Sequence, residues 1–160
     1  MLHDKTLAVV VPAYNEEKLL ERVVDEMPAF VDHIIIVDDR SKDRTPEIAD
    51  ALAENNDRVH VIRHTENQGV GAAIVTGYFY AREQQYDVTA VMAGDAQMDP
   101  NDLENVAGPV ARDEVDYCKG NRIFTGEAYK KIPKIRYFGN AVLSLMTKVA
   151  SGYWHVADSQ

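Results

Sequence analysis

A carboxylate and an amide stand two residues apart after a short apolar run, and this pair is the plainest indication of chemistry in the sequence. The run is Val88–Met92, rich in β-branched residues, and it leads through Gly94 to Asp95 and Gln97. A strand ending here presents both side chains at the carboxyl edge of a parallel sheet, where open α/β proteins bind ligands. Oxygen donors at this spacing suit a hard divalent cation that also holds phosphate oxygens. The alternative is that Asp95 only caps a turn.

Two adjacent acids, Asp38 and Asp39, follow a second apolar run at Ile34–Val37. Neighbouring carboxylates at a strand end repel each other unless hydrogen-bond donors or a cation relieve them. A nucleotide base or ribose offers such donors. The alternative is a solvated turn in which basic neighbours balance the acids, namely Arg40, Lys42 and Arg44.

Two further segments bring polar groups to predicted strand ends. The first apolar run is followed by Pro12-Ala-Tyr-Asn-Glu16, whose backbone can line a nucleotide base, with Tyr14 packed beside it. The alternative is that this segment only joins a strand to a helix capped by Asn15. Arg122 follows a predicted strand, where a guanidinium can clamp a phosphate through two hydrogen bonds. The basic cluster Lys130–Arg136 can do the same or attract an anionic membrane surface. The alternative for both is a solvated basic loop.

Several other kinds of site are not indicated. Gly69-x-Gly71 follows the third predicted strand, and Ile74 occupies the third glycine position of a dinucleotide fingerprint, so close helix–sheet packing explains these glycines better. The five histidines show no metal-ligand spacing. No serine or cysteine nucleophile motif appears. Cys118, the single cysteine, excludes an internal disulfide and is expected to be buried in a strand.

The composition is that of a globular domain. The 160 residues are 46% hydrophobic and 27% charged, which is enough to build a core. The formal net charge of −9 argues against a sequence-independent nucleic-acid binder. We find neither a signal peptide nor an apolar run of about 18 residues, and therefore expect a cytoplasmic chain without a transmembrane segment.

Strands and helices alternate along the chain. Strands are expected at Thr6–Pro12, Ile34–Val37, Arg58–Arg63, Val88–Met92 and Asp116–Gly120. Helices are expected from Asn15 to Met27, from Thr45, after Gly69, from Asp99-Pro100 and from about Ile135. This order predicts an α/β fold with a mainly parallel sheet, helices on both faces and one domain over residues 1–160. The ligand site is expected at the topological switch point between the first and fourth strands.

In their order and spacing, these motifs resemble those of family 2 glycosyltransferases with the GT-A fold, a Rossmann-like architecture. The motifs are Val10-Val-Pro-Ala-Tyr-Asn-Glu16, Val37-Asp-Asp-Arg-Ser-Lys-Asp-Arg-Thr45, Asn67-x-Gly-x-Gly-Ala, Gly94-Asp-Ala-Gln-Met-Asp-Pro100 and Gly120-Asn-Arg122. More narrowly, the chain resembles the dolichol-phosphate mannose synthase and polyprenyl-phosphate glucosyltransferase group. The resemblance covers essentially the whole chain.

The resemblance implies a binding site for a nucleotide-diphospho-sugar. Pro12, Tyr14 and Glu16 match positions that surround the nucleotide. Asp38 and Asp39 match the acids that bind the base and the ribose.

The resemblance also implies catalytic and metal-binding roles. Asp95 matches the metal-binding acid of an Asp-x-Asp element, and Gln97 matches the glutamine that assists it, with Mg²⁺ or Mn²⁺ as the cofactor. Arg122 matches an arginine near the phosphates. Asp158 resembles the start of an Asp-x-Gln-x-Gly element and is a candidate catalytic base or acceptor-site residue.

Three departures from the family pattern are present. Ala93 stands where the first acid of Asp-x-Asp is expected, and Arg40 replaces the usual glycine after Asp-Asp. The chain stops at Gln160, inside the last motif, so we expect a catalytic domain truncated at its C-terminal end.

The implied reaction is an inverting hexose transfer, from a UDP-glucose or GDP-mannose type of donor to a polyprenyl or dolichyl phosphate. Arg122, Lys134 and Arg136 are candidates to hold the acceptor phosphate. The helix from about Ile135 can lie on the cytoplasmic face of a membrane, or it can face the core of the domain. Alternatives are a saccharide acceptor in cell-envelope polysaccharide synthesis and a non-catalytic nucleotide-sugar binding module. The sugar, the base and the oligomeric state stay open.

Overall fold

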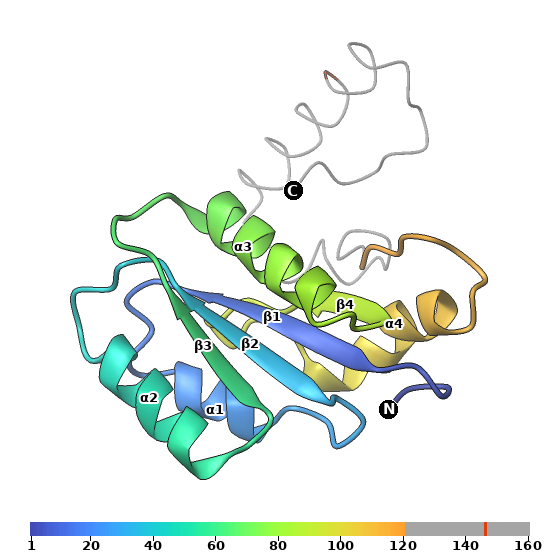
Figure 1. The fold of residues 1–160 in the computed structure, drawn as a ribbon, viewed down its shortest axis with the longest axis horizontal. Coiled ribbons are helices and arrows are strands. Elements are labelled where there is room, and N and C mark those ends of the chain that lie inside the picture. Colours follow the sequence, from blue (N-terminus) through green and yellow to red (C-terminus); the bar gives the residue numbers. More distant parts are fainter. Residues whose placement is uncertain (121–145, 147–160) are drawn as a thin grey trace, which may run out of the picture. The chain divides into compact units, whose positions relative to one another are not determined.

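The computed structural model describes residues 1–120 and residue 146. The chain divides into two units, Met1–Cys118 and Lys119–Gln160, and the elements below belong to the first. They run in the order β1 (Leu7–Ala13), α1 (Leu20–Asp25), β2 (His33–Asp38), α2 (Thr45–Asn55), β3 (Val59–Arg63), α3 (Val70–Glu83), β4 (Val88–Val91), the short 3₁₀ helix η1 (Pro100–Asp102) and α4 (Leu103–Ala111) (Figure 1).

The four strands form one parallel sheet in the order β3-β2-β1-β4. Every residue of β1 is buried, as its unbroken apolar sequence predicts for a strand covered on both faces. From β1 the chain builds outward to β2 and β3 on one side and then returns to place β4 on the other. The predicted topological switch point between the first and fourth strands is therefore confirmed.

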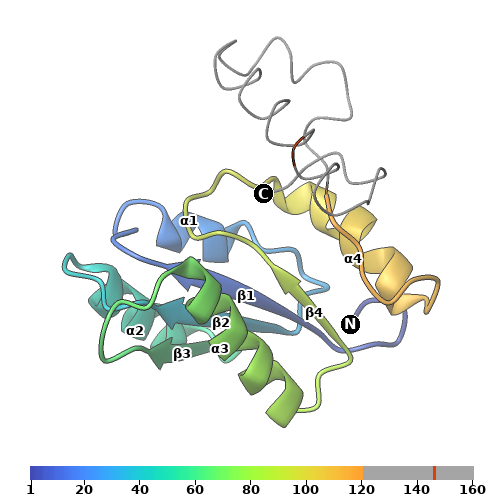
Figure 2. The same cartoon turned by 90° about the horizontal axis from the view of Figure 1, so that it is seen from above.

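The strands divide their side chains between two hydrophobic clusters. Ile34 and Ile36 pack into the cluster that contains apolar residues of α1, α2 and α4, whereas Ile35 and Val37 pack into the one that contains Ala73 of α3. This division follows from the alternation of side chains along a strand. Figures 1 and 2 show α3 on one face of the sheet and α1 and α2 on the other. The predicted α/β fold with helices on both faces is confirmed.

Gly77 allows α3 to lie close on β1. A Cβ atom at this position would overlap the side chain of Val10. We expect Gly77→Ala to lower the free energy of unfolding by about 1–3 kcal/mol, because the helix or Val10 must move to relieve the overlap. Urea denaturation measures this change.

Gly71→Ala is the matched control in the same helix. A Cβ at Gly71 meets nothing within 4 Å, so alanine should leave stability unchanged or slightly raised. A Gly77→Ala variant as stable as Gly71→Ala would contradict this account of the packing. The same geometry corrects the prediction that Gly69 and Gly71 serve close packing: Gly69 also has open space, and its φ of +87° is the backbone conformation that favours glycine.

The predicted fifth strand is wrong over its described residues. Residues 116–120 form no strand, and Tyr117 is 75% exposed. A strand-like sequence forms a strand only where a neighbouring strand is available to pair with it. Residues 116–120 pair with no strand among those that the structure describes. Cys118, expected to be buried, is half-exposed. Within the described residues, no helix is long and apolar enough to cross a membrane.

Candidate functional site

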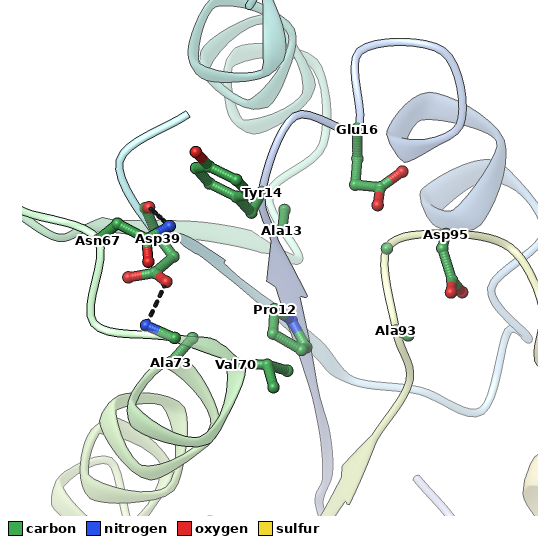
Figure 3. A pocket seen from close by; sticks show the side chains of 12 residues that line it. Pro12, Ala13, Tyr14, Glu16, Asp39, Asn67, Val70, Ala73, Ala93 and Asp95 are labelled. Atoms are coloured by element: carbon green, nitrogen blue, oxygen red, sulfur yellow. Dashed lines mark hydrogen bonds between the residues drawn. The ribbon is translucent and has the colours of Figure 1, made fainter. Parts of the chain in front are cut away.

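A pocket of about 350 Å³ opens at the carboxyl ends of β1 and β4, beside the loops that follow β2 and β3 (Figure 3). Its lining comes from four segments that are far apart in the sequence: Pro12, Ala13, Tyr14 and Glu16; Asp39; Asn67, Gly69, Val70 and Ala73; and Ala93, Gly94 and Asp95. The pocket lies at the edge of the sheet and at the switch point where the sequence predicts the ligand site.

The segment after β1 is held by the loop after β2. Asn15 adopts a φ of +58°, and its side-chain oxygen accepts a hydrogen bond from the Lys42 N–H at 2.8 Å. The Asn15 N–H donates to Ser41 Oγ, and the Glu16 N–H donates to Thr45 Oγ1 at 2.8 Å. The predicted helix start at Asn15 is therefore wrong, because these N–H groups are bound by Ser41 and by Thr45 at the start of α2, and the positive φ interrupts a helix. The helix begins only at α1.

The carboxylate of Asp39 gathers hydrogen bonds from the loop between β3 and α3. Oδ1 accepts from the Gln68 N–H at 2.8 Å and lies 2.7 Å from His64 Nδ1, and Oδ2 accepts from the Gly69 N–H at 2.7 Å. Asn67 Nδ2 donates to the Asp39 carbonyl at 3.1 Å. Asp39 thus fixes one wall of the pocket and is itself only 3% exposed.

These contacts keep Asp39 ionised. Burial by itself would raise the pKa of Asp39, but the hydrogen bonds from Gln68, His64 and Gly69 outweigh it and hold the pKa below its usual value. A buried carboxylate with such donors accepts hydrogen bonds and cannot donate them. The wall of the pocket at Asp39 can therefore accept hydrogen bonds from N–H or O–H groups.

Asp38 and Asp39 differ in their surroundings although they are neighbours. Asp38 is buried, its Oδ1 accepts a hydrogen bond from the Ser41 N–H at 3.0 Å, and it is not among the lining residues of the pocket. Since both acids are buried, the alternative of a solvated turn at this point is wrong. Of the two predicted nucleotide-binding acids, the structure brings Asp39 to the lining of the pocket, whereas Asp38 is the last residue of β2 and lies outside that lining.

Asp95 lines the pocket opposite Asp39, with Glu16 between the two in Figure 3. Asp95 Oδ1 accepts a hydrogen bond from the backbone N–H of Gln97 at 3.1 Å, whereas Gln97 itself is exposed and outside the lining. Ala93 adds only an apolar surface. Neither Asp95 nor Glu16 forms an ion pair with any residue that the structure describes.

Glu16 lies in a negative field. Burial, and after it the charges of Asp95 and Asp43, raise the pKa of Glu16 above its usual value.

In residues 1–120 and 146, no group of three or more His, Cys, Asp or Glu side chains lies close enough together to hold a metal ion. Glu16 and Asp95 can therefore supply at most part of the ligand set of a cation.

Four predicted site residues fall outside the described residues. They are Arg122, Lys134, Arg136 and Asp158.

His64 is the residue of the site that sequence reasoning missed. Its side chain is 7% exposed and lies between Asp39 and Thr76. One signal was available: His64 directly follows the third strand, and residues in that position reach the same edge of the sheet as Asp38 and Asp39.

The lowered pKa of Asp39 predicts a loss of stability in acid. The pKa of Asp43 is lowered in the same way: burial would raise it, but hydrogen bonds from Thr45 and from the Glu17 N–H outweigh burial. Folded carboxyls with lowered pKa values stabilise the protein fully above their unfolded pKa of about 4, and this contribution is lost as the pH falls further. Glu16 acts in the opposite sense. Urea unfolding at pH 7, 5, 3.5 and 2.5 should show a decline in unfolding free energy below about pH 4; a rise there would contradict the prediction.

The model of the family described as "Glycosyl transferase family 2" matches residues 8–156. The chain belongs to glycosyltransferase family 2. The matched range contains all four segments that line the pocket.

Curated relatives of this glycosyltransferase include two enzymes of lipid-phosphate glycosylation. The chain is 38% identical to the UDP-N-acetylglucosamine–dolichyl-phosphate N-acetylglucosaminyltransferase of Methanococcus voltae, over 98% of this chain and 67% of the relative. It is 33% identical to the polyprenol monophosphomannose synthase of Mycolicibacterium smegmatis, over 78% of this chain and 48% of the relative. The glycosyltransferase thus spans about half to two thirds of the length of these relatives.

The mannosyltransferase PcManGT from Pyrobaculum calidifontis, solved in complex with GDP-Man and Mn²⁺, is a similar structure. It superposes with a TM-score of 0.53 over 62% of this chain and 30% of the other, at 24% sequence identity. This likeness concerns the fold. It confirms the GT-A fold that the resemblance implied.

Proposed function

We propose that this chain binds the donor in a glycosyltransferase that moves a sugar from a nucleoside diphosphate to a polyprenyl or dolichyl phosphate. The observation that carries the proposal is the pocket at the switch point. The pocket contains the carboxylate of Asp39, which accepts hydrogen bonds, and the N-terminus of α3. It also contains two acids, Glu16 and Asp95, that have no cationic partner among the described residues. The names of the Methanococcus voltae and Mycolicibacterium smegmatis relatives support the lipid-phosphate acceptor.

The nucleoside is proposed to lie between Asp39 and the segment after β1. Asp39 accepts hydrogen bonds from the base or the ribose, and Tyr14, which lines the pocket and is partly exposed, packs against the nucleoside. Pro12 also lines the pocket. Asp38, at the end of β2, accepts a hydrogen bond from the Ser41 N–H and is not proposed to touch the nucleoside.

The diphosphate is proposed to meet the first turn of α3. Gly69 and Val70 begin this helix at the pocket, and no described side chain caps it. The N–H groups of a first helical turn have no partner within the helix and, with the helix dipole, favour a phosphate. Gly69, Val70 and Ala73 of this region line the pocket, so a ligand there would meet the first turn of α3.

The residues present fit a divalent cation, Mg²⁺ or Mn²⁺. Carboxylate oxygens are the ligands that these hard cations prefer, and Asp95 and Glu16 line one pocket with no basic partner in the described part of the chain. Asp95 is proposed as the protein ligand, assisted by Gln97, with diphosphate oxygens and water in place of the acid missing at Ala93. When bound, the cation neutralises the charge that develops on the diphosphate leaving group.

The acceptor phosphate is proposed to attack the anomeric carbon of the sugar from the face opposite the diphosphate, which leaves with the bonding electrons and inverts that carbon. An ionised phosphate needs cationic side chains to hold it more than it needs a base. Arg122, Lys134 and Arg136 are the proposed holders, and Asp158 is the proposed acceptor-site acid, all from sequence alone. These residues would bring the transfer to a membrane surface.

Calorimetric titration of the chain with UDP-N-acetylglucosamine and with GDP-mannose, each with and without Mn²⁺, tests the proposed function. Saturable binding of one donor that strengthens with Mn²⁺ is the expected result. Binding of neither donor, in a chain whose circular dichroism shows it folded, would overturn it.

A further inference from the structure

A chain of hydrogen-bonded polar side chains runs from α3 to the pocket and ends at Asp39. Thr76 Oγ1, on α3, lies 2.9 Å from His64 Nε2, and His64 Nδ1 lies 2.7 Å from Asp39 Oδ1. The His64 and Asp39 side chains are 7% and 4% exposed. None of the motifs that indicated a nucleotide site includes His64 or Thr76.

The hydrogen on His64 Nδ1 follows from its partner. An ionised carboxylate only accepts hydrogen bonds, so Nδ1 must carry the hydrogen whether the ring is neutral or charged. The hydroxyl of Thr76 can donate to a bare Nε2 or accept from a protonated one, so it fits either state. His64 therefore donates to Asp39 in every protonation state of the ring.

The hydrogen bonds on Asp39 leave little of its carboxylate free. Each carboxylate oxygen has two acceptor positions. His64 and the Gln68 N–H occupy those of Oδ1, and the Gly69 N–H occupies one on Oδ2. One acceptor position remains, on Oδ2, in a residue that lines the pocket.

We propose that His64 is a positioning residue that orients Asp39 so that its one remaining acceptor position takes the single N–H of a uracil ring. Uracil presents one N–H between two carbonyl groups, whereas guanine presents an N–H and an amino group side by side, which call for two acceptor positions. The donor is accordingly a uridine diphosphate sugar. This inference rests on the proposed function and adds to it the identity of the base and the residue that selects it.

Substitutions of His64 separate positioning from mere structural support. His64→Leu removes the donor to Asp39, and His64→Asn restores an N–H near the position of Nδ1. We expect His64→Leu to weaken UDP binding by about 10-fold or more, the size of one charge-assisted hydrogen bond. His64→Asn should stay within about 3-fold of the wild-type chain. Thr76→Val, which leaves the bond between His64 and Asp39 in place, should change UDP affinity little.

Pyrophosphate with Mn²⁺ is the control ligand, because it contains the diphosphate without the base. Its affinity should be the same in the wild-type chain and in His64→Leu, whereas a general loss of structure would weaken both ligands. Unchanged UDP affinity in a folded His64→Leu variant, or equal loss for both ligands, would overturn the role of His64. Tighter binding of GDP than of UDP by the wild-type chain would overturn the choice of base.

Nuclear magnetic resonance of ¹⁵N-labelled histidine gives a readout that needs no ligand. The His64 ring should show a directly bonded hydrogen on Nδ1, and a ring with a bare Nδ1 would contradict the proposal. A wild-type chain that binds neither UDP nor GDP would overturn the proposed function and the base-selecting role together. Two results together support the proposal. His64→Leu loses UDP affinity but keeps its affinity for pyrophosphate, and Nδ1 of His64 carries a hydrogen in the wild-type chain.

Discussion

Replacing Asp95 with asparagine is expected to abolish the Mn²⁺-dependent part of UDP binding. The amide keeps the size of the side chain and can still accept the Gln97 N–H, but it loses the charge that a hard cation prefers. The ratio of UDP affinities with and without Mn²⁺ should fall to about 1 in the variant, from at least about 10 in the wild-type chain, which is a loss of about 1.4 kcal/mol or more. Calorimetric titration with UDP at a fixed Mn²⁺ concentration measures both affinities.

Asp99→Asn is the matched control for Asp95. Asp99 lies four residues further along the chain, is exposed, and accepts hydrogen bonds from Asn101 at the start of η1, outside the lining of the pocket. Its substitution should leave the effect of Mn²⁺ unchanged. If Asp95→Asn kept the full response to Mn²⁺, Asp95 would not be the metal ligand, and Glu16 would be the next acid to test.

Replacing Asp39 with asparagine is expected to lower the free energy of unfolding by about 2–3 kcal/mol. Both oxygens of Asp39 accept hydrogen bonds from the protein, so whichever of them becomes an amino group will face an N–H donor. A buried donor left without an acceptor costs about 1–3 kcal/mol, and the loop between β3 and α3 depends on these bonds. Urea denaturation at pH 7 measures the loss, which is a large share of the 5–15 kcal/mol that stabilises a typical domain.

Asp38→Asn provides the comparison, because Asp38 is equally buried and adjacent. It accepts one described hydrogen bond, from the Ser41 N–H, and the remaining oxygen of asparagine can still accept it. The loss should be under about 1 kcal/mol. Equal losses for the two variants would show that Asp39 does not hold the loop in the way that its contacts indicate.

The general architecture was predictable from sequence because its signals are local. Unbroken apolar runs such as those of β1 and β2 indicate strands covered on both faces, and the Asp99-Pro100 pair marks a helix start that the structure confirms. Parallel pairing then follows from the alternation of strands and helices. The wrong predictions are those in which a distant segment decides: Ser41 and Thr45 bind the N–H groups of Asn15 and Glu16, and residues 116–120 pair with no described strand.

The site shows the same division between local and distant causes. The sequence alone specified which acids follow strands, and therefore that Asp39 and Asp95 lie at one edge of the sheet. The folded structure was needed to separate Asp39 from Asp38 and to bring His64 and Thr76 behind Asp39. The physical reason is that hydrogen bonds join groups that are close in space, and the partners of Asp39 lie 25 and more residues away along the chain. Residue types and spacing describe the donors and acceptors, but packing decides which of them meet.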